Sequence, residues 1–337
     1  MTARRDAVTL RFLAAPTDVN THGYVDGGKI LEWIDKAGYA CAAAWSGKYA
    51  VTGYVGNIRF SSIIAAGDMV EVEARIVYTG RTSLQVVCTV SSYSPQKPEP
   101  ILNTQCLLAF VAMDSNGKPT PVPTFEPYDE WSRTEHDRSL TLSKVRREIE
   151  KAMVDQVYSD ATEACRETLR FLAEPTDVNW GGKVHGGYVM HWIMTAGQLV
   201  AERWCHGRAE ATHAGGFRFY RPMMIGDLVE VDARLIYTEG NEMHVSVWVR
   251  SGDPRGTELR TTTHCIVVFS ARNDAGDDVS VRPWVPRLPE DRALERHAVD
   301  LIEIRKKLIR STPNKANAES LKQPDNERQQ EADPKTN

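Results

Sequence analysis

Two stretches of the sequence hold residue types that can polarise a carbonyl group and activate water. Each runs from an asparagine, through five residues, to a polar residue and a Gly-Gly pair: Asn20-x5-Asp26-Gly27-Gly28 and Asn179-x5-His185-Gly186-Gly187. If a helix begins at each pair, its first N–H groups lack intrahelical partners and carry the positive end of the helix dipole. They can then hold a negative oxygen. A carboxylate that could act as a base, Asp35, follows the first pair only.

These stretches belong to an internal repeat. Residues 9–38 recur as residues 168–197, an offset of 159 (168 minus 9), and 19 of the 30 positions are identical. The correspondence continues without a net insertion as far as Phe110 and Phe269. A unit of this length, present twice, indicates duplicated domains rather than a solenoid, whose repeats are short and need at least three copies. The copies differ at positions suited to chemistry: Asp26 against His185, Asp35 against Met194, and Tyr24 against Lys183.

Each copy has the same order of expected elements. In the first copy an apolar strand, 9–13, precedes a Pro-Thr-Asp-Val-Asn turn, and a run with helical periodicity covers 29–44. Alternating segments follow in both copies: VTGYVGNIRF, DMVEVEARIVYTG, TSLQVVCTVSSYS and ILNTQCLLAFVAM, then GGFRFY, DLVEVDARLIYTE, MHVSVWVRSG and TTTHCIVVFSAR. We expect a strand, one helix and a four-stranded antiparallel meander in each copy, an α+β plan with helix against sheet.

The segments outside the repeat define connectors. A proline-rich stretch, SNGKPTPVPTFEP, breaks regular structure after the first copy, and charged, periodically apolar runs at 139–157 and 292–309 predict helices. From residue 311 the chain has almost no apolar residue, which predicts disorder. The expected division is an N-terminal domain (1–130), a helical connector (131–160), a C-terminal domain (161–285), a C-terminal helix (286–310) and a disordered tail (311–337).

Composition narrows the class of protein. The 337 residues suffice for two domains of ordinary size, each with its own core. A net charge of −4 without a long basic run before the tail argues against nucleic acid as a partner. No N-terminal apolar segment suggests a signal peptide, and no apolar run approaches the roughly 18 residues that span a bilayer, so we expect no membrane insertion. The six cysteines form no C-x-x-C pair, which favours reduced thiols, no bound metal and a cytoplasmic location.

The order of a strand, a helix entered through Asn-x5-(His/Asp)-Gly-Gly, and a long meander resembles the hotdog fold of acyl-CoA thioesterases. Its duplication resembles the tandem, double-hotdog acyl-CoA hydrolases, and the match covers residues 9–113 and 168–272. The resemblance implies sheets joined edge to edge, sites between domains, and homo-oligomers, namely trimers of double hotdogs. It also implies hydrolysis of acyl-CoA to acid and CoA without a cofactor, coenzyme A being part of the substrate. One departure is that many relatives have Asp or Asn where this chain has Tyr24 and Lys183.

Helix geometry predicts which parts share a site. Gly28 and Asp35 are seven residues apart, which is about 10 Å along a helix at 1.5 Å per residue. Asp35 is therefore too far along to act on a carbonyl held at its own helix N-terminus, and should serve the Gly-Gly end of the other domain. Of the two sites that this pairing predicts, the one joining Asp35 to residues 179–187 has a carboxylate. The other joins residues 20–28 to Met194 and should be degenerate.

The site with the carboxylate has the parts for thioester hydrolysis. Asp35 is the candidate general base, or a nucleophile forming an anhydride. The N–H groups after Gly186 and Gly187 would hold the oxyanion, and the Asn179 amide would donate a second hydrogen bond to the carbonyl. His185 would orient the carbonyl or position the loop.

Further candidates surround these residues. Thr52, whose counterpart is Ala211, has a hydroxyl that related thioesterases place near the water, and Thr82-Ser83 resembles a family pair. Four basic side chains are candidates for the phosphates of CoA: Arg59, Arg218, Arg221 and Lys183. Three apolar ones are candidates for an acyl slot between helix and sheet: Trp33, Trp192 and Met194.

Structural alternatives stay open at this stage. The Gly-Gly pairs also suit a tight turn, the asparagines suit turn backbone, Asp35 beside Lys36 suits a surface acid, and a lone histidine such as His185 is usually structural. A non-catalytic acyl-CoA binding or sensing module is the main alternative function. A hotdog dehydratase would use an Asp/His pair on a different line, and a transcription regulator would need a DNA-binding extension; the sequence contains neither.

Overall fold

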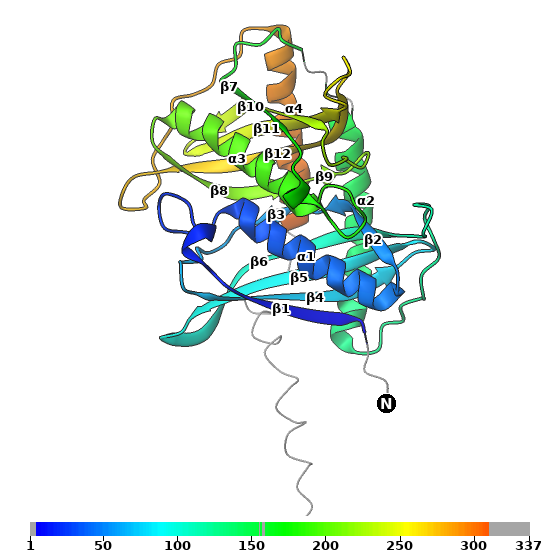
Figure 1. Ribbon diagram of the computed structural model, residues 1–337. Coiled ribbons are helices and arrows are strands. Elements are labelled where there is room, and N and C mark those ends of the chain that lie inside the picture. The colour runs from blue at the N-terminus through cyan, green and yellow to red at the C-terminus, as the bar shows by residue number, and fades with distance from the viewer. Residues whose placement is uncertain (1–4, 155, 157–158, 310–337) are drawn as a thin grey trace, which may run out of the picture.

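The computed structural model of the protein describes residues 5–154, 156 and 159–309 (Figure 1). It has two similar halves, each with one long helix packed on an antiparallel sheet, so the predicted α+β plan of tandem hotdog domains is confirmed. The elements of the first half are β1 (Ala7–Leu13), α1 (Gly27–Ser46), β2 (Tyr49–Val55), β3 (Ile58–Arg59), β4 (Met69–Thr79), β5 (Ser83–Ser94) and β6 (Lys97–Met113). Those of the second half are β7 (Arg166–Leu172), α3 (Gly186–Cys205), β8 (Arg208–Gly215), β9 (Phe217–Arg218), β10 (Leu228–Glu239), β11 (Glu242–Gly252) and β12 (Arg260–Arg272).

The sheets follow from alternating apolar residues. The first has the order β1-β4-β5-β6-β2-β9 and the second β3-β8-β12-β11-β10-β7, with antiparallel neighbours throughout. Alternate residues of a strand point to one face, and in β10 those facing the helix are fully buried: Val229, Val231, Ala233 and Leu235. A short 3-10 turn, Pro16–Asp18 or Pro175–Asp177, follows the first strand of each half. The core thus lies between each sheet and its helix.

The halves are joined by exchanged two-residue strands. β9 of the second half pairs with β2, and β3 of the first half pairs with β8. The prediction of VTGYVGNIRF as one strand was therefore wrong, because the chain leaves its own sheet after Val55. GGFRFY likewise covers β9 but misses most of β8. A Cβ on Gly215 would lie 2.6 Å from the Cα of Asn57, so the two chains cross at a separation that glycine permits.

The helices α1 and α3 lie next to each other on the same side of the joined sheets (Figure 1). Each begins at its Gly-Gly pair, two residues earlier than predicted for α1, because the preceding residue caps it. Asp26 accepts a hydrogen bond from the N–H of Gly28, and His185 accepts one from Gly187. The chain therefore presents both helix N-termini toward the other half.

Two further helices, α2 (Glu130–Val154) and α4 (Pro289–Ile309), cover the sheet faces opposite α1 and α3: α2 crosses from the first sheet, where Ser143 accepts a hydrogen bond from Gln85 of β5, to the second, and α4 packs on the second. On the second sheet both helices contact Ile236 of β10 and Ile266 of β12. Ile266 alternates with Cys265 and Val267, which face the core on the other side. α2 begins at Glu130 rather than at 139 because the Asp129 carboxylate accepts a hydrogen bond of 2.7 Å from the N–H of Ser132. The end of the predicted 139–157 helix and the predicted tail, 311–337, lie outside the described residues.

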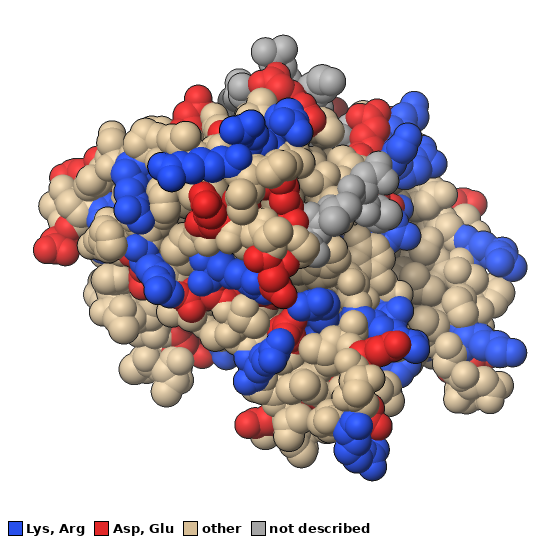
Figure 2. Space-filling model, turned by 90° about the horizontal axis from the view of Figure 1, so that it is seen from above, with Lys and Arg blue, Asp and Glu red and all other residues tan. Residues whose placement is uncertain are grey.

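Two general properties of the described chain bear on its environment. None of its helices is both long and apolar enough to cross a membrane. Four cysteines are buried, and burial raises the pKa of the Cys41 thiol to about 12, so that group stays protonated at neutral pH. Acidic and basic side chains are interspersed on the face shown in Figure 2.

Candidate active site

The carboxylate of Asp35 lies buried where the two halves meet. It is in the middle of α1 and only 2% exposed, so the alternative of a surface acid is wrong. The hydroxyl of Thr52, from β2, donates a hydrogen bond of 2.6 Å to its Oδ1. The backbone N–H of Gly187, at the start of α3, donates one of 2.9 Å to its Oδ2. Asp35 therefore contacts the helix N-terminus that the other half provides.

His185 links the loop of the second half to this carboxylate. Its Nδ1 accepts a hydrogen bond of 3.0 Å from Gly187 N–H and lies 3.1 Å from Oδ2 of Asp35. The ring is buried. These contacts hold the first turn of α3 against the carboxylate, which suits a group that positions others.

The two glycines that open α3 make different close contacts. A Cβ on Gly186 would lie 3.1 Å from Oδ2 of Asp35, so this residue faces the carboxylate. A Cβ on Gly187 would lie 2.8 Å from the Cα of Glu32, so this residue lets the two helices touch. Neither has a left-handed φ, whereas Gly182 in the preceding turn does, at 74°. Close approach, and not turn conformation, therefore explains the pair.

Asn179 is largely occupied by its own turn. Its Oδ1 accepts hydrogen bonds from the N–H groups of Gly181 at 2.8 Å and Lys183 at 3.1 Å. Its Nδ2 donates to the carbonyl of Val184 at 3.4 Å, near the outer limit for a hydrogen bond. Asn20 uses its Oδ1 in the same way in the first half. The turn alternative holds for the oxygen, and Nδ2 remains as the donor for a carbonyl.

Aromatic rings beside the carboxylate were missed by sequence reasoning. Trp180 stacks on Tyr39 of α1 with ring centroids 4.4 Å apart and planes 2° from parallel. Tyr49 of β2 lies 6.2 Å from Tyr39, and a Cβ on Gly181 would overlap its ring. Burial raises the pKa of both tyrosines. A comparison of the two copies could have pointed to this ring, because Trp180 occupies the position of Thr21 in the first copy.

The equivalent place in the other half is apolar. Met194 occupies the position of Asp35, and its Cε would lie 2.9 Å from a Cβ on Gly27. Ala211 occupies the position of Thr52. Asp26 is present but caps Gly28 at 2.7 Å. The side chain that replaces the carboxylate is therefore a thioether, which can neither accept nor deliver a proton.

A cavity of about 360 Å³ opens beside this second arrangement, between the loop of the first half and α3. Its lining includes Thr21 and Gln198, the counterparts of Trp180 and Tyr39. Where the first arrangement has two stacked rings, the second has smaller polar side chains and an open space.

The helices share an ion pair that sequence reasoning also missed. Glu32 and His191 occupy equivalent positions (32 plus 159 is 191), and His191 Nδ1 lies 2.6 Å from Glu32 Oε1. The hydrogen bond to Glu32 raises the pKa of His191. Burial alone would raise the pKa of Glu32, but the hydrogen bond from His191 and the charge of Lys29 outweigh it, so that pKa is lowered. The pair ties α1 to α3 close to both helix N-termini.

Three predicted residues lie away from the carboxylate. Ser83 begins β5, and β6 separates that strand from β2 with its Thr52. Trp33 stacks on Phe12 of β1, and Trp192 meets Phe171 of β7 edge to face. Residues two apart on a helix do not share a face, so Trp33 points away from Asp35. The two tryptophans fill the cores near the outer sheet edges.

The predicted phosphate ligands have different surroundings. Arg218 donates a hydrogen bond of 2.7 Å to Glu150 of α2, so its charge is already balanced. Arg59 is exposed on β3, opposite His213 of β8, and Lys183 is half-buried in the loop before α3. Arg221 lies in the loop after β9.

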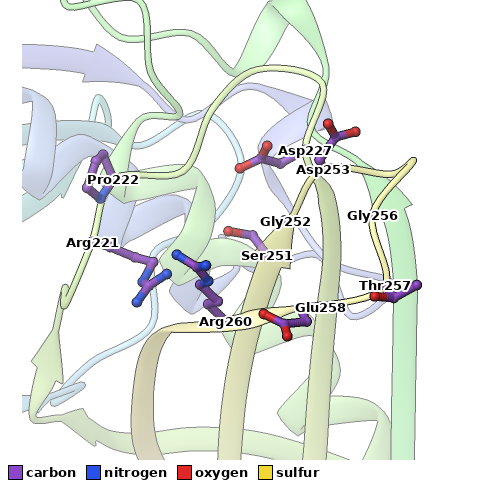
Figure 3. Close-up of a pocket in the computed structure, with 10 residues that line it drawn as sticks. All are labelled: Arg221, Pro222, Asp227, Ser251, Gly252, Asp253, Gly256, Thr257, Glu258 and Arg260. Atoms are coloured by element: carbon purple, nitrogen blue, oxygen red, sulfur yellow. The ribbon is translucent and has the colours of Figure 1, made fainter.

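Arg221 faces a cavity of about 480 Å³ together with Arg260, which sequence reasoning missed (Figure 3). Figure 3 shows their side chains pointing toward each other, with the carboxylates of Asp227 and Asp253 on the other side of the pocket. Within the described residues neither guanidinium forms a hydrogen bond or ion pair. The remaining lining residues are Pro222, Ser251, Gly252, Gly256, Thr257 and Glu258. Two arginines on one pocket suit an anion, which would lie on their side of it, away from Asp227 and Asp253.

Comparisons with known proteins all point to the same family. The sequence model of the family described as "Thioesterase superfamily" matches residues 22–99 and residues 181–258, once in each half. The protein VdlD of Helicobacter pylori is 32% identical over 145 residues, covering 43% of this chain and 83% of that protein. The cytosolic acyl coenzyme A thioester hydrolase of Mus musculus is 27% identical over 303 residues, covering 85% of this chain and 79% of that protein. The crystal structure of an acyl-ACP thioesterase from Bacteroides thetaiotaomicron superimposes on 79% of this chain and on 98% of that protein, with a TM-score of 0.51. At 13% sequence identity this is a similarity of fold.

Proposed function

Because the chain belongs to the thioesterase superfamily, we propose that it hydrolyses acyl-CoA to a carboxylic acid and CoA at one site shared by its two halves. The observation that carries the proposal is the hydrogen bond of 2.9 Å from Gly187 N–H to Asp35 Oδ2. It joins a candidate base on α1 to the helix N-terminus of the other half. The similarity to the cytosolic acyl coenzyme A thioester hydrolase of Mus musculus supports acyl-CoA as the substrate class.

The start of α3 polarises the thioester. The carbonyl oxygen accepts a hydrogen bond from Gly186 N–H, which as the first residue of the helix has no intrahelical partner. The positive end of the α3 dipole stabilises the oxyanion, and a donor of this kind contributes about 10²- to 10³-fold in rate. The Asn179 Nδ2 group, weakly held by its turn, donates a second hydrogen bond.

Asp35 activates the water. A water molecule between the carboxylate and the carbonyl carbon gives its proton to Asp35 while its oxygen attacks the carbon. When the tetrahedral intermediate collapses, the C–S bond breaks, and the CoA thiolate leaves and takes up that proton. Thr52 holds Oδ1 through its hydroxyl, and His185 holds the helix start, so both position the base. Attack by Asp35 itself to form an anhydride and release the CoA thiolate is the alternative. If water then attacks the Asp35 carbonyl carbon of the anhydride, its labelled oxygen stays in the Asp35 carboxylate, which general-base hydrolysis never labels.

The arginine pair suits the far end of the substrate. Arg221 is two residues beyond Phe219, whose N–H donates a hydrogen bond of 3.1 Å to the carbonyl of Gly53, next to Thr52. The loop that holds Arg221 therefore starts beside the base. A CoA molecule with its thioester at Asp35 can direct its phosphates to Arg221 and Arg260, and guanidinium groups bind phosphate in a bidentate manner.

The second arrangement lacks a base, because Met194 and Ala211 replace Asp35 and Thr52. We propose that it does not hydrolyse thioesters and that each chain has one working site. Assembly into homo-oligomers such as trimers, and a cytoplasmic location, stay predictions.

The experiment that tests this function is thiol release from butyryl-, octanoyl- and palmitoyl-CoA by the full chain. A thioesterase releases one thiol for each acid formed, over many turnovers. A binding or sensing module would retain acyl-CoA and release no thiol on prolonged incubation, and that result would replace the proposal with the non-catalytic alternative.

A further inference from the structure

We propose that the stacked rings of Trp180 and Tyr39 close the acyl end of the site and set the longest acyl chain that it accepts. The inference rests on the proposed function, because it assigns the substrate range of the same site. It begins from an exposed tryptophan: the Trp180 side chain is 66% exposed, and yet its ring lies flat on Tyr39 across the joint between the halves. A large aromatic residue held on the surface in this way acts as a cover.

The cover lies directly beside the base. Tyr39 follows Asp35 by four residues, so both are on one face of α1 and one helical turn, about 6 Å, apart. Trp180 is also close to the opposite wall, with its ring centroid 6.1 Å from that of His185. Tyr49, beneath the loop at Gly181, lies on a third side. A chain leaving the carbonyl in this direction meets the rings after a few methylene groups.

The course of the strand β2 is the reason for assigning the acyl end to this side of the base. Along β2, Tyr49 precedes Thr52 by three residues, whereas Tyr54 and Val55 follow it and pair with β9. The rings and the β9 segment that leads to Arg221 are therefore on opposite sides of the base. A substrate with its phosphates at Arg221 and Arg260 points its acyl chain toward Tyr49, Tyr39 and Trp180.

The other half shows what the site looks like without the cover. There Thr21 and Gln198 replace Trp180 and Tyr39, and both line the open cavity of about 360 Å³. The same elements form both places, and Thr21 and Gln198 are smaller than the rings that they replace, so we attribute the open space to these side chains. The residues of one half therefore specify how to remove the cover in the other.

The experiment exchanges these residues. Trp180→Thr, Tyr39→Gln and the double variant are assayed for thiol release with butyryl-, octanoyl- and palmitoyl-CoA beside the unaltered chain. We expect kcat/KM for palmitoyl-CoA relative to butyryl-CoA to rise about tenfold in the double variant, because pocket size discriminates chains on this scale. The matched control, Thr21→Trp with Gln198→Tyr, builds the same rings over the other cavity and should leave the chain-length profile unchanged.

The outcomes separate the inference from the function it rests on. An unchanged chain-length profile in variants that still hydrolyse butyryl-CoA would overturn the inference and leave the proposed function intact. So would a uniform loss for all chain lengths with weaker inhibition by free CoA, since the rings would then hold the CoA end. Absence of thiol release by the unaltered chain would overturn both.

Discussion

The two places where a helix of one half meets the Gly-Gly end of the other have the same backbone and opposite chemistry. At the first, Asp35 receives hydrogen bonds from Thr52 and Gly187 and lies against Gly186. At the second, Met194 lies against Gly27 without an acid or a hydroxyl at the corresponding positions. A few substitutions therefore separate a buried polar cluster from an apolar contact.

The comparison also shows that the two copies have diverged site by site, and each site combines residues of both halves. The first half contributes the acid and the hydroxyl, while the second contributes the helix start and its histidine cap. Neither half contains the whole set. The polar residues can be kept in one place and lost from the other because each site takes its acid from one half and its Gly-Gly pair from the other.

The largest expected effect follows removal of the acid. We expect Asp35→Ala to lower kcat about 10³-fold, within the range for loss of a general base. Asp26→Ala removes the acid that precedes the other Gly-Gly pair and should stay within about threefold, because Asp26 caps a helix. Thiol release from an acyl-CoA measures both. Since Asp35 is buried, circular dichroism and Asp35→Asn, which keeps the side-chain shape, show whether the loss is chemical. A larger effect at Asp26 than at Asp35 would reverse the assignment of the two sites.

Substitution of alanine for the first glycine of each Gly-Gly pair tests whether the two places differ in function. Gly186→Ala places a Cβ 3.1 Å from Oδ2 of Asp35, and we expect kcat to fall about 10²-fold because the carbonyl loses its donor geometry. Gly27→Ala meets the flexible end of Met194 and should change kcat less than threefold, or about 0.6 kcal/mol in the barrier. Equal losses in both variants would mean that the Gly-Gly pairs serve folding alone.

Loss of the hydroxyl should have a smaller effect. Thr52→Ala removes the hydrogen bond of 2.6 Å to Asp35, and we expect kcat to fall about tenfold, because a hydrogen bond to a charged group contributes roughly 1.5–3 kcal/mol. Ala211→Thr adds a hydroxyl at the matching position beside Met194 and should not raise the rate. A Thr52→Ala chain with unchanged kcat and KM would remove this residue from the site.

The smallest effect concerns the ion pair between the helices. The lowered pKa of Glu32 gives stability above its unfolded value of 4.5 that is lost as pH falls through the folded value. The raised pKa of His191 gives stability below its unfolded value of 6.5 that is lost as pH rises through the folded value. The pair therefore contributes most between about pH 4.5 and 6.5.

We expect His191→Gln to destabilise the fold by about 1 kcal/mol near pH 5.5, because the side chain is partly exposed and its charge is screened. The difference should shrink toward pH 9. Thermal unfolding across this range measures it, with His22→Gln, an exposed histidine, as the control. A destabilisation that grows with pH would contradict the charged pair.

Helix geometry and strand alternation predicted much of each half from the sequence, but not the contacts between the halves. The fixed rise of a helix was enough to expect Asp35 to face the Gly-Gly end of the other half, and alternation was enough for the meander. The catalytic roles of these residues stay predictions. Sequence reasoning missed the Trp180–Tyr39 stack, the Glu32–His191 pair and Arg260. These depend on which helix faces and loops meet across the joint, and no periodicity within one element contains that information. The split after Val55 was missed for the same reason.

The most direct test of one shared site is a double-mutant cycle of Asp35→Ala and Gly186→Ala, measured as kcat for thiol release. If the acid of one half and the glycine of the other act on the same thioester, the two losses are not additive. Gly186→Ala should then cost about 10²-fold in the unaltered chain and less than about threefold in the Asp35→Ala chain. If the two losses instead multiply in the double variant, the residues act independently, and the shared site is wrong.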